Sequence, residues 1–400
     1  MYYTSNKVIP QEYEKLAVQR PIRVLHVVGG MNRGGIETWL MHVLRHIDRD
    51  RIHMDFLVHT TEPCHYDDEV RQLGSQVIPC PNPTNPWFYA HNFRRILHQH
   101  GLYDIIHSHV HHYTGFILYL AQLAGVPARI AHSHLDSSYQ ETKAKWQRKL
   151  YLAFMKQLIT HHASVGLACS QDAAVDLFNS GWTTDPRWQL LYCGIDLKPF
   201  QEVIDTGTIR TALSIPGDAF VIGHVGRFEP QKNHKFLIEI AAAVAQKEPK
   251  MRLLLVGQGF LRTEIEQQVV ESNLVDKVIF AGTRSDVPHL MRGVMDLFLF
   301  PSLYEGLPIV GLETQAAGLP IIMSDVIPRE LDQVESLTQR LSLSQPASVW
   351  AEAVLAARNA RRHDSQNRSL ASLEKSKFNI KYSVESLIKV YENQYYQTKS

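Results

Sequence analysis

The feature that most constrains the fold is an alternation of short apolar runs with helical spacings, repeated in two series along the chain. The first run, IRVLHVV at residues 22–28, is followed by glycines, and apolar residues recur with helical spacing from residue 36. A buried strand, a glycine-rich turn and a helix in this order open a doubly wound parallel sheet. The alternation continues to about residue 195, with helices predicted at 67–74, 86–100, 114–124, 141–162 and 171–179.

A second series follows a segment of Gly, Pro and mixed polarity, CGIDLKPFQEVIDTG, which we interpret as a hinge. Its predicted helices span 233–247, 260–273, 286–293, 308–317 and 347–360. The predicted fold class is therefore α/β, with two doubly wound Rossmann-like domains, 1–195 and 196–375, that face a central cleft. The C-terminal segment, 376–400, is predicted to form an amphipathic helix that crosses back to the first domain.

Composition narrows the class of protein. The formal net charge is +1, so nothing global favours nucleic acid, and no such partner is expected. The four cysteines are scattered without a C-x-x-C pair, which argues against disulfides and structural zinc. The first 20 residues lack the apolar core of a signal peptide, and no run approaches the roughly 18 apolar residues of a membrane span. We expect a cytoplasmic protein, or one bound peripherally to the inner face of the cell membrane.

The segment SLYEGLPIVGLETQAAGLPII, residues 302–322, places two glutamates at the end of a predicted strand. Pro308 suits the first helical turn, and the free N–H groups at 306–309 make a positive site for an anion or a polar sugar. Glu313 lies one turn further on, where a carboxylate can accept hydrogen bonds from vicinal hydroxyls such as those of ribose. The alternative is that Glu305 is a helix N-terminal charge and Glu313 a solvated residue. The largely apolar helix favours burial of Glu313.

Two further loops have the composition of phosphate sites. In GHVGRFEPQKNHKF, Arg227 and Lys232 flank a helix N-terminus, an arrangement that suits a diphosphate, although a solvated basic loop has the same composition. In GGMNRGG, residues 29–35, backbone N–H groups can cradle phosphate. This is not a G-x-G-x-x-G fingerprint, and the next strand ends in His59 instead of a carboxylate. Both differences argue against a dinucleotide dehydrogenase.

These motifs together resemble a known family. EGLPIVGLE matches the E-x7-E motif of retaining glycosyltransferases of family 4, which have the GT-B fold, and GRFEPQKN and GGMNRGGIE resemble that family's diphosphate and glycine-rich loops. The resemblance covers about residues 20–390. HHYTGF and AHSHLDS further resemble the branch that builds exopolysaccharides, capsules or O-antigens. One departure is VIPREL, which stands where many members have a glycine-rich loop before a glutamate.

The resemblance implies roles for particular residues. Glu313 would bind the ribose, and Glu305 would hold the donor sugar together with the backbone of Gly306, Leu307, Pro308 and Ile309. Arg227 and Lys232 would neutralise the diphosphate, with Gly34 and Gly35 approaching it from the first domain. Thr283 and Arg284 would meet the base, and His134 would lie near the reacting sugar. The implied catalytic set is Glu305, His134, Arg227 and Lys232. No metal or other cofactor is expected, because these groups take the place of a divalent cation.

The predicted function is transfer of a hexose-type sugar, with retention of configuration, from a nucleoside diphosphate sugar, with UDP as the expected nucleotide. The expected acceptor is a saccharide or a polyprenyl-diphosphate-linked saccharide in cell-surface polysaccharide synthesis. One alternative is a nucleotide-sugar epimerase of the same fold, which would need a general base aimed at a ring C–H. Another is a non-catalytic sugar-nucleotide-binding partner of a transferase, against which the intact motif set weighs.

Two other segments leave alternatives open. In IIHSHVHH, His107, His109 and His111 are predicted to alternate onto one strand face, where they either ligate a metal or hydrogen-bond to substrate or loop. No further ligand is evident, which favours hydrogen bonding. The helix at 141–162 carries five Lys or Arg residues with Trp146, Tyr151 and Phe154. It either lies on an anionic membrane surface or packs as an ordinary surface helix.

Overall fold

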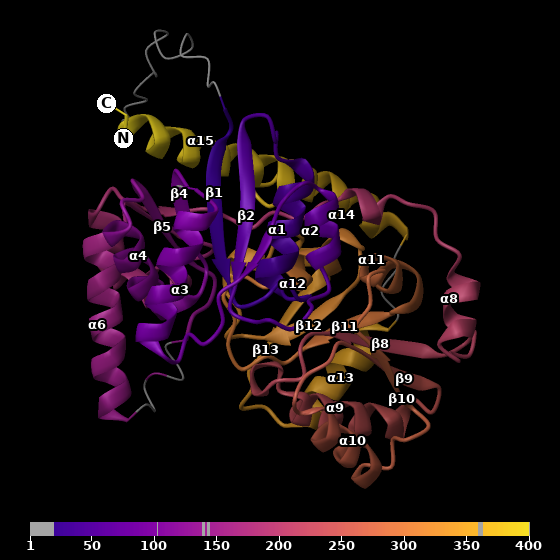
Figure 1. The fold of residues 1–400 in the computed structure, drawn as a ribbon. Coiled ribbons are helices and arrows are strands. Elements are labelled where there is room, and N and C mark those ends of the chain that lie inside the picture. The colour runs from indigo at the N-terminus through magenta and orange to yellow at the C-terminus, as the bar shows by residue number, and fades with distance from the viewer. Residues whose placement is uncertain (1–19, 102, 138–140, 142–144, 359–362, 400) are drawn as a thin grey trace.

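A computed structural model describes residues 20–399 except 102, 138–140, 142–144 and 359–362. Two parallel sheets form the structure, with strand orders β3-β2-β1-β4-β5-β6-β7 and β10-β9-β8-β11-β12-β13 (Figure 1). The first sheet contains β1 (Ile22–Val28), β2 (Ile52–Val58), β3 (Val77–Pro79), β4 (Ile105–Ser108), β5 (Ala128–Ser133), β6 (Val165–Ala168) and β7 (Trp188–Leu190). The second contains β8 (Phe220–Val225), β9 (Met251–Val256), β10 (Val278–Gly282), β11 (Leu297–Phe300), β12 (Ile321–Ser324) and β13 (Thr338–Leu341). The predicted pair of doubly wound α/β sheets is confirmed.

Each sheet has a switch point where the strand order reverses, at β1 beside β4 and at β8 beside β11. In open α/β sheets, ligands bind beyond the carboxyl ends of the strands at such points. The central strands are almost wholly buried, since helices cover both faces of each sheet, and this is why they read as continuous apolar runs.

The helices of the first domain follow the predicted positions closely. They are α1 (Gly35–His46), α2 (Asp67–Gln72), α3 (Pro86–Gln99), α4 (Thr114–Leu123), α6 (Trp146–His162) and α7 (Gln171–Phe178). The predicted helix 141–162 begins among residues that lie partly outside the described chain, and its described body is α6.

The second domain carries α8 (Thr206–Ala212), α9 (His234–Lys247), α10 (Arg262–Glu271), α11 (Val287–His289), α12 (Ile309–Ala316), α13 (Ala347–Ala357) and α14 (His363–Glu374). Three elements were not predicted: α8, α14 and β13. The sequence of β13, TQRL, contains one apolar residue and no alternation of apolar and polar residues, so it lacks the signal of a buried strand. The strand is half-exposed at the edge of the sheet. No helix in the described part of the chain is both long and apolar enough to cross a membrane.

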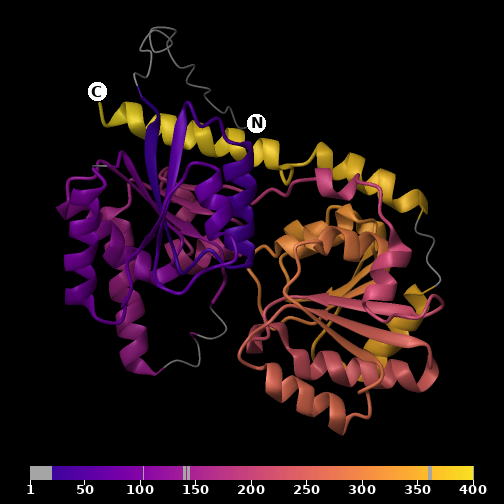
Figure 2. The ribbon, with the colours of Figure 1, turned by 45° about the vertical axis from the view of Figure 1, so that its right-hand side comes forward.

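The last helix, α15 (Ile380–Gln397), lies along the first sheet and contacts α1 and β1 (Figure 2). Val384, Leu387 and Tyr391 form its buried stripe. Trp39 Nε1 donates a hydrogen bond to Ser383 Oγ at 3.0 Å. At the hinge, Ile195 exchanges backbone hydrogen bonds with the chain just before α15, at 2.8 and 3.0 Å. A side chain on Gly194 would meet the Asn379 carbonyl oxygen at 2.7 Å, so glycine permits this close crossing.

Candidate functional site

The carboxyl end of β11 holds a buried ion pair. Glu305, in the loop between β11 and α12, receives Lys232 Nζ at 2.6 Å on Oε1 and Gln231 Nε2 at 3.0 Å on Oε2. Lys232 ends a 3₁₀ turn that precedes α9, and its ammonium also lies 5.1 Å from the ring centroid of Phe300. The side chains of Lys232 and Glu305 are only 14% and 6% exposed, so this charge pair is largely removed from solvent screening.

Arg227 follows β8 in the same loop as Lys232 but is differently placed. Its side chain is 60% exposed, and its guanidinium lies 3.0 Å from Glu229. A guanidinium has five N–H donors in a planar fork, so one carboxylate leaves donors for a second anion. Arg227 is thus available at the domain surface, whereas Lys232 is held inside.

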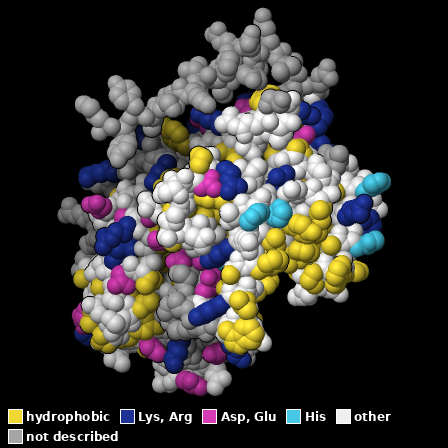
Figure 3. Space-filling view, turned by 90° about the vertical axis from the view of Figure 1, so that its left-hand side faces the viewer, with side chains coloured by type: hydrophobic (Ala, Val, Ile, Leu, Met, Phe, Trp, Pro, Cys, Tyr) yellow, Lys and Arg dark blue, Asp and Glu magenta, His cyan; other side chains and the backbone are white. Residues whose placement is uncertain are grey.

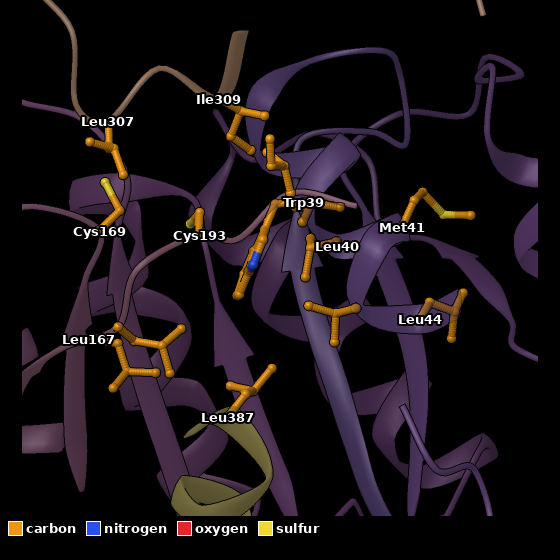
Figure 4. Close-up of a cluster of buried hydrophobic side chains, with 14 of the residues drawn as sticks. Trp39, Leu40, Met41, Leu44, Leu167, Cys169, Cys193, Leu307, Ile309 and Leu387 are labelled. Carbon is orange, nitrogen blue, oxygen red and sulfur yellow. The ribbon is translucent and has the colours of Figure 1, made fainter. Parts of the chain in front are cut away.

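The start of α12 touches the first domain. A Cβ on Gly306 would lie 2.0 Å from the carbonyl oxygen of His134, so only glycine allows the two loops to meet. Leu307 packs beside Cys169, and Ile309 lies close to Trp39 of α1 (Figure 4). Pro308 is the N-cap residue of α12, as the sequence predicts for a proline at the helix start, and Gly318 ends the helix with a φ of +67°. The backbone proposed to hold a sugar therefore lies at the junction of the domains.

Glu313 lies one turn inside α12, on the side facing the first domain. Burial raises the pKa of Glu313 to about 7. Burial also raises the pKa of Tyr66, and the charge of Glu313 adds to that shift, which places the two side chains in electrostatic reach across the domain boundary. The sequence alternative of a fully solvated Glu313 is wrong.

The glycine-rich loop brings a carboxylate that the sequence analysis did not assign. Gly34 is the N-cap residue of α1, and a Cβ on it would lie 2.4 Å from Glu37 Oε2. Burial raises the pKa of Glu37 to about 7, against the opposing effects of its own backbone amide and of Arg227 in the other domain. A Cβ on Gly35 meets nothing within 4 Å. A Cβ at residue 34 would therefore need a shift of the flexible Glu37 side chain, whereas a Cβ at residue 35 would meet open space.

The loop after β10 is tied to the first domain. Arg33 NH1 donates to the carbonyl oxygen of Arg284 at 3.0 Å, and the Arg33 guanidinium lies 5.2 Å from the ring centroid of Tyr66. The Arg284 side chain pairs with Asp286 at 2.6 Å, and Thr283 is partly buried in the same turn. The predicted base-binding loop thus already has one of its carbonyl groups in a bond across the domain boundary.

His134 follows β5, and both nitrogens of its ring are directed into the first domain. Nε2 lies 2.9 Å from His109 Nδ1, and Nδ1 lies 3.7 Å from the sulfur of Cys193. Burial, with a further contribution from His111, lowers the pKa of His134 to about 3, so the ring is neutral near pH 7. Toward Gly306 of the other domain, His134 presents its backbone carbonyl oxygen.

The histidine-rich segment does not form the strand face that its alternation predicts. β4 ends at Ser108, and His111 adopts a φ of +51° in a 3₁₀ turn, where its Nε2 lies 3.0 Å from Asp176 Oδ2. The prediction that His111 shares a face with His107 and His109 is therefore wrong.

Metal-type ligand atoms come within 4.8 Å of one another in three groups of described residues: His26 with His107 and His109, His109 with His132 and His134, and His112 with Glu141 and Asp176. In the first group His26 hydrogen-bonds to His109, and in the second His109 hydrogen-bonds to His134. The remaining members of these two groups, His107 and His132, hydrogen-bond to each other. In the third, Lys156 Nζ lies 3.7 Å from Glu141 and 3.8 Å from Asp176, so an ammonium group already faces both carboxylates.

A cavity of about 890 Å³ lies beside this site, between α6 and α7. Its lining includes Asp136, two residues beyond His134, with Glu141, Asp176, Lys149 and Lys156. Across the domain boundary, Glu330 Oε1 of the VIPREL segment accepts a hydrogen bond from the Gln171 amide at 3.2 Å. The cavity lining thus combines apolar side chains with charged groups of both signs.

Sequence reasoning missed several residues that the structure brings to the site. Glu37 and Arg33 lie within GGMNRGGIE, a segment that the sequence analysis singled out for its glycines alone. Gln231 lies within the recognised loop GRFEPQKN. Tyr391 of α15 carries no local signal, since its partners come from strands almost the whole chain away.

The comparisons with known proteins agree with this arrangement. Residues 205–368 match the family described as Glycosyl transferases group 1, and residues 34–194 match the Glycosyl transferase 4-like domain. Over 345 residues, the chain is 41% identical to a protein named glycosyltransferase EpsF from Bacillus subtilis (strain 168), covering 85% of this chain and 88% of that one. It is 29% identical over 230 residues to UDP-Gal:alpha-D-GlcNAc-diphosphoundecaprenol alpha-1,3-galactosyltransferase from Escherichia coli, covering 56% of this chain and 58% of that one.

Solved structures share the fold. The crystal structure of Anabaena Alr3699/HepE in complex with UDP and glucose matches with a TM-score of 0.77 at 19% identity, over 93% of this chain and 99% of that one. WaaG, described as a glycosyltransferase involved in lipopolysaccharide biosynthesis, matches with a TM-score of 0.73 at 18% identity, over 92% and 99% of the two chains. The two facing Rossmann-like domains are thus a GT-B fold. The chain belongs to glycosyltransferase family 4.

Proposed function

We propose that the chain transfers a hexose-type sugar from a nucleoside diphosphate sugar, with UDP as the nucleotide, to a saccharide or polyprenyl-diphosphate-linked acceptor in cell-surface polysaccharide synthesis. Transfer retains the anomeric configuration. The observation that carries this proposal is the buried Lys232–Glu305 pair beside the N-terminus of α12, facing the His134 loop of the other domain. The structural neighbour with bound UDP and glucose and the Escherichia coli relative named for a diphosphoundecaprenol acceptor support the choice of substrates.

The proposed mechanism rests on charge placement. As the anomeric bond breaks, negative charge develops on the leaving diphosphate. Lys232, Arg227 and the free amides at the start of α12 stabilise that charge as it forms. Because these cations and dipoles take the role of a divalent ion, we propose that transfer needs no metal.

Glu305 and Glu313 would accept hydrogen bonds from hydroxyl groups at two positions along the donor. Glu305 would exchange part of its bonding with Lys232 and Gln231 for the sugar hydroxyls, and Glu313 would accept from the ribose. Losing either carboxylate leaves polar groups unpaired and the donor misplaced. His134 would act through its carbonyl oxygen and the position of its loop, since both its ring nitrogens are engaged in the first domain.

The cavity between α6 and α7 is the proposed acceptor site. It opens beside Asp136, close to the His134 loop, and its carboxylates can accept from saccharide hydroxyls. Lys149 and Lys156 line the same cavity and suit an acceptor diphosphate. A saccharide linked to a lipid diphosphate would therefore meet matching groups along its length.

The test is a thermal-shift screen with UDP-, GDP-, ADP- and TDP-sugars, followed by transfer assays on a lipid-linked saccharide. A donor at a hundred times its Kd raises stability by about 2.7 kcal/mol, so a UDP-sugar should give a clear rise in Tm. Product analysis should show a retained anomeric configuration in the transferred sugar. Recovery of an epimerised sugar nucleotide without transfer would overturn the proposal in favour of an epimerase.

A lipid-linked acceptor makes attachment to the membrane surface useful, and we propose that α6 provides it. Trp146, Leu150 and Phe154 are 69%, 61% and 55% exposed on this helix. Lys145 and Arg148 are exposed on the same helix end. Figure 3 turns this side of the molecule toward the viewer and shows hydrophobic side chains interspersed with His and with charged side chains of both signs. Exposed aromatic and basic residues together suit the interface of an anionic bilayer.

Sedimentation with liposomes checks the membrane proposal. Binding should be strong to anionic vesicles at low salt, weaker at high salt and weak to neutral vesicles. The double variant Trp146→Ser/Phe154→Ser should lose most of the binding. Phe260→Ser is the matched control, since Phe260 is 75% exposed on the other domain. Equal binding to neutral and anionic vesicles would contradict the proposal.

A further inference from the structure

An unbroken chain of hydrogen bonds runs through the buried face of the first sheet, from the interdomain site to α15. Its members are five imidazoles and one phenol, and each group bonds to the next. The links are His134 Nε2 to His109 Nδ1 at 2.9 Å, His109 Nε2 to His26 Nδ1 at 3.0 Å, His26 Nε2 to Tyr391 OH at 3.3 Å, Tyr391 OH to His107 Nδ1 at 2.8 Å, and His107 Nε2 to His132 Nδ1 at 3.1 Å.

The sheet register brings these rings together. His26 of β1 pairs directly with His107 of β4, and β5 lies on the other side of β4. His132 and His134 are two residues apart, so they point to the same face of the sheet. Trp39 of α1 packs against that face, with its ring centroid 5.2 Å from that of His132. All but His134 are almost completely removed from solvent.

Each of the five imidazoles in this series of hydrogen bonds is neutral near pH 7. Burial lowers the pKa of His26 to about 3 and those of His107, His109 and His132 well below the usual value, with the neighbouring rings adding to the shift in the last three. A neutral imidazole has one N–H donor and one acceptor nitrogen. Each ring in the chain uses both nitrogens except His132, whose Nε2 has no partner. The chain must therefore run in one direction, with each group donating to the next.

The two ends decide that direction. At one end is the orphan Nε2 of His132, and at the other His134 Nδ1 lies 3.7 Å from the Cys193 sulfur. If His132 donates first, every N–H has a partner and the thiol sulfur accepts the last one. The opposite direction leaves a buried N–H without an acceptor and needs the thiol as a donor. A buried N–H without an acceptor is rarer and costs more free energy than a buried acceptor without a donor, so the first direction is favoured. All five rings are then protonated at Nδ1.

We propose that Tyr391 is a positioning residue for the transfer reaction: through this one-directional chain, α15 fixes the ring of His134 and thereby the loop whose carbonyl oxygen faces Gly306 of the other domain. The role in turnover rests on the proposed function, whereas the direction of the chain does not. Tyr391 is the link on which the chain depends, because its hydroxyl accepts from His107 and donates to His26. Since α15 follows directly on the hinge crossing at Ile195, the chain joins that crossing to the reaction loop.

The experiment compares Tyr391→Phe with Ser383→Ala in the full chain. Both variants remove one buried hydroxyl from the same face of α15, but Ser383 bonds Trp39 and lies outside the chain. Both should lower Tm. Only Tyr391→Phe should lower kcat, by about 10- to 100-fold as expected for a slightly misplaced reaction loop. The KM for the donor should stay unchanged, since the donor-binding carboxylates belong to the other domain.

A second measurement needs no activity. Long-range ¹H–¹⁵N correlation spectra of the histidine-labelled protein distinguish protonated from unprotonated ring nitrogens. Single His→Gln variants assign the signals of the five rings. The wild type should show Nδ1–H in all five. In Tyr391→Phe, the Nδ1–H of His107 loses its acceptor, so His107 and His132 should show a mixture of the two tautomers. His26, His109 and His134 should remain Nδ1–H, because their last N–H still has the Cys193 sulfur as its acceptor.

Several outcomes would overturn the inference. An Nε2–H pattern or an imidazolium in the wild-type chain would contradict the assigned direction. Equal losses of kcat in Tyr391→Phe and Ser383→Ala, with donor binding intact, would reduce Tyr391 to a structural role. If the wild type gives no Tm rise with any sugar nucleotide, the proposed function fails instead, and the spectra still decide whether the directional chain exists.

Discussion

Replacing Lys232 with methionine is expected to lower kcat for sugar transfer by about 100- to 1,000-fold, the usual effect of losing one preorganised group that stabilises developing charge. The same change should destabilise the fold by about 3 kcal/mol, because it leaves Glu305 buried with only the Gln231 amide as a partner. Steady-state kinetics and urea denaturation measure the two effects separately.

The double variant Lys232→Met/Glu305→Gln separates the two effects of Lys232. Removing the buried charge of Glu305 should restore most of the lost stability, whereas kcat should stay low. Glu305→Gln alone should retain nucleoside diphosphate binding and lose transfer. If Lys232→Met alone keeps the wild-type kcat, Lys232 serves only to neutralise Glu305, and its proposed action on the diphosphate is wrong.

Glu313→Gln is expected to make the unliganded protein more stable at pH 8 while abolishing the Tm rise with donor. Burial raises the pKa of Glu313 to about 7 from an ordinary value of 4.5, and no basic side chain among the described residues forms an ion pair with it. A carboxyl whose pKa is higher in the folded state favours folding when protonated. Its contribution is fully present below pH 4.5 and is lost as the pH rises through 7.

The size of this effect follows from the shift. This difference between the folded and unfolded pKa values corresponds to a change of at most about 3 kcal/mol in the free energy of unfolding at pH 8. A smaller change is expected because Glu313 keeps some access to solvent. Thermal unfolding of both proteins at pH 5 and pH 8 should show a gain for the variant that grows with pH. Glu37→Gln is a matched control for the electrostatic part, since burial raises the pKa of Glu37 to about 7 as well. A gain that is equal at both pH values would show that charge is not its cause.

Local sequence predicted the elements of the site well. The strand, loop and helix from β11 to α12 were placed within a residue or so, because an apolar run, a proline and a glycine each act over a few residues. The roles assigned to Lys232 and Glu305 were separate, however, and their pairing depends on how β8 and β11 lie side by side. The ring orientation of His134 was also beyond prediction, since it is set by His109 and Cys193 from two other elements.

The histidine-rich segment shows where periodicity fails. Alternation placed three histidines on one face, but the strand ends after Ser108 and the positive φ of His111 turns that side chain away. A sequence pattern cannot indicate where a strand stops when the residues that follow are still compatible with it. The prediction for the edge strand β13 failed in the opposite way. Its polar residues gave no strand signal, although the segment pairs in parallel with β12.

The contacts of Leu307 with Cys169 and of Ile309 with Trp39 form an apolar interface at the point where the two domains would have to separate. Separating the domains would expose two aliphatic side chains to water, at a free-energy cost of about 1.5–3 kcal/mol each. We therefore expect the open form to be a minor species of the unliganded protein, and any release of product between the domains to require the loss of these apolar contacts.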